Sequence, residues 1–202
     1  MPDTMTLVSS QPPTTSARDP LRVYWRTGDP TRVLAVLKSI GLPVSDGRVL
    51  LWPVLLSVAA AEGSDPDRLE MGDPVPGPMA VSTPGDPRLV ALGWATVDAE
   101  RLAASLGKPL AHEAHEDPAL GAIGYGIASA TLPLVLLEPA AEGRIAAALA
   151  RLGEGPVALF LDGVTVGTAD DATPLARTGT GRIGRLIRPP RAWGPFIVAL
   201  QP

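Results

Sequence analysis

Residues 92–109, LGWATVDAERLAASLGKP, share a pattern with an earlier stretch, VYWRTGDPTRVLAVLKSIGLP at residues 23–43. Each stretch opens with β-forming residues and continues into a helical pattern that begins after an aspartate, a favoured N-cap. A glycine, Gly41 or Gly107, stands where each helix is expected to end. Four residue types recur at one constant offset: Trp25 and Trp94, Thr27 and Thr96, Asp29 and Asp98, Arg32 and Arg101. This recurrence predicts an internal repeat built on a strand followed by a helix.

Short apolar runs follow each copy and predict further strands. The runs at 49–52 and 54–60 bracket Pro53, and the runs at 122–128 and 132–137 follow the second copy. A third strand begins at 156–166, but a Gly-, Pro- and Arg-rich stretch with no clear helix follows it, and the chain closes on the apolar run 196–200. The strand–helix–strands unit is therefore expected three times, with a degenerate third copy.

These patterns divide the chain into segments. We expect a flexible N-terminal tail at 1–20, a first βαββ-type module at 21–62, a Pro-rich linker at 63–87, a second βαβββ module at 88–140, a connecting helix at 141–154 and a third, degenerate module at 155–202. Either the first module pairs with the second and the third swaps with another subunit, or the first is an added lobe.

Composition excludes several classes of protein. The net charge of −4 and the pI near 5.2 argue against a nucleic-acid partner, which favours a basic patch. The chain has no cysteine and two histidines, so it can form neither a disulfide nor a thiolate metal site. No apolar run approaches the roughly 20 residues that span a bilayer, and no signal peptide is evident, so we expect a cytoplasmic protein without a membrane partner.

Three stretches carry a resemblance to a known family. They are RLVALGWATVD at 88–98, PLVLLEP at 133–139 and GRIAAALARLGEGPVALFLD at 143–162. Together they resemble the methylmalonyl-CoA-epimerase-like members of the vicinal oxygen chelate superfamily. The resemblance implies an α+β fold of repeated βαβββ modules, whose curved mixed sheets form a bowl with helices on the convex side. It also implies a possible homodimer and a divalent metal inside the bowl.

The positions that hold the metal in the family are apolar in this chain. They fall on Ala91, on Val135, on the pair Val157 and Ala158, and on Ala199 or, with a shift of one residue, Val198. Metal coordination needs N, O or S donors, which these side chains lack. We therefore predict that the chain binds no metal at these positions and needs no cofactor.

Strand alternation then predicts what lines the bowl. The expected ligand-binding residues on the family-like strands are Ala91, Gly93, Val135, Ala158, Phe160 and Ala199. The repeat offset adds Arg22, Tyr24 and Arg26 from the first module, where an arginine pair could clamp a carboxylate or phosphate. The alternative for this trio is an edge strand with a polar face toward solvent.

Three polar segments contain candidate functional residues. Asp162 is the one acid expected to point inward, where desolvation would raise its pKa and suit it to acid–base catalysis; alternatively it forms a turn with Gly163. The loop 111–118 carries donors at close spacing, and its alternative is a solvated surface loop. The donors of the loop 111–118 are His112, Glu113, His115 and Glu116. The stretch GTGRIGR at 179–185 lacks the strand–helix context of a phosphate loop.

Three functions fit these features. The first is a metal-free protein that binds an apolar or amphipathic small molecule, such as a natural product, in its bowl, as bleomycin-resistance-type members of the superfamily do. The second is a metal-independent isomerase, cyclase or lyase on a polyketide-like or acyl substrate, with Asp162, Glu113 or Tyr24 as the acid–base group. The third is a non-catalytic interaction protein whose bowl is filled by its own side chains.

Overall fold

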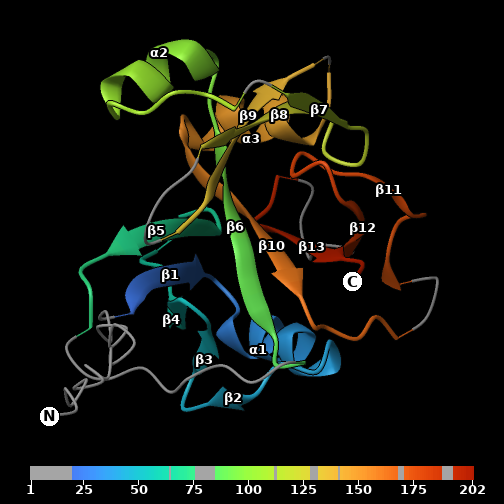
Figure 1. Cartoon of the computed structure of the whole chain (residues 1–202). Coiled ribbons are helices and arrows are strands. Elements are labelled where there is room, and N and C mark those ends of the chain that lie inside the picture. The colour runs from blue at the N-terminus through green and yellow to red at the C-terminus, as the bar shows by residue number, and fades with distance from the viewer. Residues whose placement is uncertain are drawn as a thin grey trace, which may run out of the picture.

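The computed structural model describes residues 20–63, 65–75, 85–111, 113–127, 132–140, 142–167, 171–187 and 193–202. The tail predicted at 1–20 lies outside these residues, apart from Pro20. The described residues form a smaller lobe near the N-terminus and a larger, strongly curved sheet that contains the C-terminus (Figure 1).

The smaller lobe contains the first module. Its sheet has the order β2-β3-β4-β1-β5, in which β1 lies parallel to β4 and antiparallel to β5. The elements are β1 (Leu21–Thr27), α1 (Pro30–Ser39), β2 (Val44–Ser45), β3 (Arg48–Leu51), β4 (Val54–Ala60) and β5 (Arg68–Gly72).

Strand β5 lies inside the segment predicted as a linker, 63–87, so that expectation is wrong for residues 68–72. Leu69 buries its side chain in the core while β5 hydrogen-bonds to the free edge of β1, and this pairing outweighs the prolines nearby. Residues 76–84 of the same segment lie outside the described residues.

The larger sheet has the order β11-β12-β13-β10-β6-β9-β8-β7. Its first half is β6 (Arg88–Ala95), α2 (Ala99–Ser105), β7 (Ala114–Asp117), β8 (Ala122–Ile127) and β9 (Leu134–Pro139). After α3 (Arg144–Leu152) come β10 (Gly155–Asp162), β11 (Ala176–Arg177), β12 (Ile183–Ile187) and β13 (Phe196–Leu200). The first strand of each half pairs in parallel with its last strand, and the halves join through the antiparallel pair β6–β10. The second and third modules therefore close the bowl, and the first is an added lobe.

The helix signals in the repeat are confirmed. The side chains of Asp29 and Asp98 accept hydrogen bonds from the backbone N–H groups of Arg32 and Arg101, three residues later. Gly41, just after α1, has a φ of +83°. Such a left-handed conformation favours glycine.

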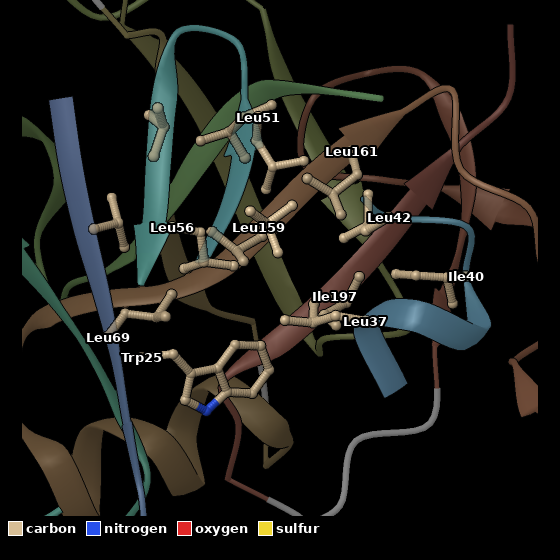
Figure 2. Packing of buried hydrophobic residues seen from close by; sticks show 14 of the residues in the cluster. Trp25, Leu37, Ile40, Leu42, Leu51, Leu56, Leu69, Leu159, Leu161 and Ile197 are labelled. Atoms are coloured by element: carbon tan, nitrogen blue, oxygen red, sulfur yellow. The ribbon is translucent and has the colours of Figure 1, made fainter. Parts of the chain in front are cut away.

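The added lobe packs against the outer side of the bowl. Trp25, Leu37 and Leu56 belong to one buried cluster with Leu159 of β10 and Ile197 of β13 (Figure 2). In the described residues no helix follows β10 within the third module. Helix α1 packs mainly on β1, β2 and β4 of its own lobe, and its Leu37 belongs to the cluster shared with β10 and β13. The backbone N–H of Thr165 donates to the carbonyl of Ile40 at 3.0 Å, which ties the two lobes at the end of α1.

The other two helices contact different parts of the large sheet. Ala99 and Ala103 of α2 pack on Leu136, on the convex side. Ile145 and Ala148 of α3 are buried in the cluster that contains the concave-face residues, and α3 packs beside β6 and β9. Of the helices in the described residues, none is long and apolar enough to cross a bilayer.

Candidate ligand-binding site

The inward-facing residues of β13, β10, β6 and β9 form what we call the bowl floor. These four strands are neighbours in the sheet, and Phe160 lies opposite Ala91 on one side and Val198 on the other. Ala158 and Phe160 are fully buried. A Cβ added to Gly93 would lie within 3.0 Å of Ala158, Leu137 and Phe160, so the floor is tightly packed around this glycine.

One of the predicted floor residues lies on the other face of the sheet. Ala199 pairs in register with Leu161 and belongs to the cluster shared with the added lobe, whereas Val198 pairs with Phe160 and faces inward. The shifted alternative is therefore the one observed. Inside and outside alternate along a strand, so an alignment displaced by one residue moves a side chain to the opposite face.

The floor does not fit the metal that the fold family implies. The inward positions are Ala91, Val135, Ala158 and Val198, and all are at most 5% exposed and carry hydrocarbon side chains. None offers an N, O or S donor. Among the described residues, no group of three or more His, Cys, Asp or Glu side chains is placed to hold a metal ion.

A pocket of about 370 Å³ lies above this floor, and we call it the mouth pocket. It contains Ala91 and Val135, the two predicted ligand-binding residues that reach it, while Gly93, Ala158 and Phe160 lie in the packed core. Its walls are largely apolar. The lining consists of Val90, Ala91, Ala111, Glu113, His115, Gly126, Ile127, Pro133, Leu134, Val135, Gly179 and Thr180.

The turn between β11 and β12 covers part of the bowl. Gly179 packs on Val135 and Leu137, and a Cβ added to Gly124 of β8 would overlap the Gly179 backbone. The Asp117 carboxylate, 1% exposed, accepts hydrogen bonds from the N–H groups of Gly179 at 2.9 Å and Leu120 at 3.0 Å. A buried acid and two facing glycines thus bring the two edges of the large sheet together over the floor.

Burial raises the pKa of the Asp117 carboxyl above its usual value, and backbone N–H groups, led by that of Gly179, oppose the rise. Asp117 was not among the expected functional residues. It stands in an acidic, Pro-flanked segment that is typical of a solvated loop, and its partner Gly179 is far away in sequence.

Polar groups gather at the rim of the mouth pocket. His115 Nδ1 lies 3.8 Å from Glu113 Oε1, and the imidazole packs against Gly181, where a Cβ would overlap the ring. Thr180 lies beside them in the lining. The expected loop 111–118 contains strand β7, and His112 lies outside the described residues.

Asp162 does not behave as the expected inward acid. Burial alone would raise the pKa of Asp162, but hydrogen bonds from Arg88 and Arg182 outweigh it and hold the pKa below its usual value. Its Oδ2 lies 2.9 Å from Arg88 and 3.2 Å from Arg182, and its Oδ1 accepts from Gly163 N–H at 3.0 Å. The expectation of a raised pKa for Asp162 is therefore wrong, because two arginines distant in sequence, Arg88 and Arg182, bind its carboxylate at the turn.

The trio Arg22, Tyr24 and Arg26 lies on the sheet of the added lobe, away from the mouth pocket. The edge-strand alternative is also wrong, because β1 sits between β4 and β5. The three side chains share the face of β1 that points away from the core.

Two βαβββ-like units joined through their first strands, with a closed concave face, define the class of the larger lobe. This strand order confirms the predicted α+β fold, in which curved mixed sheets form a bowl. The third unit departs from the class in lacking a helix after β10 within the described residues.

Comparison with known proteins gives similarity at the level of solved structures. No family model and no curated protein matches the sequence. A hypothetical protein from Bacillus halodurans is 17% identical over 57% of this chain and 94% of its own, with a TM-score of 0.43. Methylmalonyl-CoA epimerase from Mycobacterium tuberculosis is 22% identical over 56% of this chain and 88% of its own, with a TM-score of 0.42. A mutant 4-hydroxymandelate synthase from Streptomyces coelicolor is 15% identical over 88% of this chain and 68% of its own, with a TM-score of 0.40.

Proposed function

We propose that the protein binds an apolar or amphipathic small molecule in the mouth pocket without a metal ion. The observation that carries this proposal is a pocket of about 370 Å³ whose walls are largely hydrocarbon and whose floor lacks metal donors. Ligand pockets of this kind bury most of a small ligand against apolar side chains and orient it with a few polar groups.

The rim supplies those polar groups. Glu113, His115 and Thr180 are the polar side chains of the lining, while Ala91, Ile127 and Val135 supply apolar wall. An amphipathic ligand would place its apolar body on the wall and a hydrogen-bonding group at the rim.

The binding test is a fluorescence titration with N-phenylnaphthylamine, a neutral apolar probe. Ala111 is an exposed residue of the pocket lining, so Ala111→Trp should block the pocket while leaving the core intact. We expect saturable binding by the wild type and at least about tenfold weaker binding by the variant. Val97→Trp is the matched control, since Val97 is 66% exposed and outside the lining. Equal binding by the wild type and Ala111→Trp would contradict the proposal.

Metal-independent catalysis is a second candidate function because Glu113 lines the pocket. Of the other two predicted acid–base groups, Asp162 is held by two arginines and Tyr24 lies on the other sheet. With N-phenylnaphthylamine as the probe of binding, Glu113→Gln should leave affinity within about twofold. With an acyl thioester panel, the same substitution should abolish any turnover shown by the wild type; unchanged turnover would remove Glu113 from this role.

A further inference from the structure

The added lobe carries a polar sheet face that is separate from the mouth pocket. Residues paired in register share a face, so Arg22, Leu55 and Leu50 form one row across β1, β4 and β3. The next row runs from Glu70 of β5 through Tyr24 and Ser57 to Arg48. We call the part of these two rows on β1, β4 and β3 the oxyanion face. It is defined by Arg22, Tyr24, Arg48, Leu50, Leu55 and Ser57.

Positive charge on this sheet exceeds the negative charge that faces it. Arg26 and Arg68 are both compensated by Glu70, with N–O distances of 3.1 Å and 2.7 Å. Arg22 and Arg48 have no carboxylate partner among the described residues. Within the part of the chain that the structure describes, the oxyanion face therefore carries two guanidinium groups without a paired carboxylate.

Arg22 is also short of a hydrogen-bond acceptor. Its Nη1 donates to the Tyr24 hydroxyl oxygen at 2.9 Å, but its Nε is buried and makes no hydrogen bond. Because the Nε atom is closed to solvent, a ligand would meet the outer guanidinium N–H groups of this part-exposed arginine.

The Tyr24 ring packs against Gly72 and lies beside Arg22. A Cβ at Gly72 would lie 2.7 Å from Tyr24 Cε2, so the glycine leaves the space that the ring occupies. The Arg22 and Arg26 guanidinium carbons lie 5.6 Å and 5.0 Å from the ring centroid. Leu50, 38% exposed, adds apolar surface to the same face.

We propose that the oxyanion face binds a small organic oxyanion, a carboxylate or phosphate attached to a short apolar group. The oxyanion would accept hydrogen bonds from the guanidinium groups of Arg22 and Arg48, and the apolar group would lie on Tyr24 and Leu50. Guanidinium groups form strong, charge-assisted hydrogen bonds with both kinds of anion. The choice of an anion as occupant follows from the two arginines that no described carboxylate pairs with.

The internal repeat supports a separate role for this face. The constant offset places Arg22 at the position of Ala91 and Tyr24 at the position of Gly93, both of which belong to the closed apolar floor of the bowl. The same strand position therefore carries opposite chemistry in the two lobes. β5 occupies the edge of β1 that, in the bowl, is occupied by the first strand of the paired module.

To test the proposal, the full chain is titrated with benzoate, phenyl phosphate and neutral benzyl alcohol, and binding is measured from the amide NMR shifts. We expect saturable shifts at β1, β3 and β4 with at least one of the two anions, at a Kd of about 1 mM or tighter, and none with the alcohol. The anion that binds identifies the headgroup as carboxylate or phosphate. Arg22→Gln and Arg48→Gln should each weaken binding about tenfold or more.

Matched variants separate binding from folding. Arg32→Gln removes an exposed arginine of α1 and should bind as the wild type does. Gly72→Ala should displace the Tyr24 ring and weaken binding with both guanidinium groups retained. Ala111→Trp should leave anion binding unchanged, so failure at one site is distinguishable from failure at the other. Equal binding by Arg22→Gln, equal shifts with the alcohol, or no saturation with either anion would overturn the proposal.

Discussion

At the scale of single residues, Glu154 shows how one side chain fastens a helix to the sheet. It accepts hydrogen bonds from the Thr96 hydroxyl and from an Arg101 N–H, each at 2.6 Å to Oε1, and from the Val97 backbone N–H at 2.9 Å. Glu154 belongs to the GEG stretch that contributed to the family resemblance. In this structure it joins the start of β10 to the residues just before α2.

This geometry predicts a pH dependence of stability. The hydrogen bond from Thr96, followed by those from Arg101 and Val97, lowers the pKa of Glu154 from 4.5 to about 2. A depressed pKa contributes stability that is present above pH 4.5 and is lost as the pH falls toward 2. Glu154 is partly exposed, so solvent screening limits the contribution to about 1 kcal/mol.

Urea unfolding as a function of pH measures this contribution. Glu154→Gln should be less stable at neutral pH and should lose less stability than the wild type on acidification. Glu142 is exposed and lies just before α3, and the control variant Glu142→Gln should keep the wild-type pH dependence. A parallel acid profile for Glu154→Gln and the wild type would contradict the assignment.

A second prediction concerns the contact between Gly124 and Gly179. A methyl group at position 124 would overlap the backbone of the β11–β12 turn, and overpacking of this kind costs about 1–3 kcal/mol. Gly124→Ala should therefore destabilise the fold and separate the turn from β8. Gly155→Ala is the matched control, because its Cβ would have no neighbour within 4 Å. Equal denaturation midpoints for the two variants would show that the closure contributes no stability.

At the scale of elements, α1 contributes to the hydrophobic cluster that joins the added lobe to the bowl. Leu37 is fully buried in the cluster shared with β10 and β13. Leu37→Ala should cost about 2–5 kcal/mol, typical of a buried leucine. Leu106→Ala, at a leucine 46% exposed, should cost much less. Guanidinium unfolding compares them, and similar small losses would show that α1 is not part of the bowl's core.

The sequence patterns predict some of these elements and miss others for physical reasons. The aspartate caps and the alternation in β6, β9 and β10 are local signals, and the structure has them as predicted. Strand β5 depends on a distant edge of β1, which no local pattern contains. The pKa of Asp162 depends on Arg88, 74 residues away in sequence, and on Arg182. The role of Asp117 depends on Gly179, 62 residues away.

At the scale of the whole molecule, the two lobes share one hydrophobic cluster. It joins β1, β4 and α1 to β6, β10 and β13. We therefore expect the lobes to unfold together. Native-state hydrogen exchange should give amides of β1 and of β10 the same opening free energy. A lower value for β1 would show that the added lobe opens by itself.

The inward side chains of the bowl floor offer no donor to a divalent ion. Elemental analysis can check this on untagged protein dialysed against manganese, cobalt, nickel or zinc and then against metal-free buffer. We expect far less than one ion per chain and no change at the amides of Ala91 and Val135. One tightly held ion per chain that shifts those two amides would contradict it.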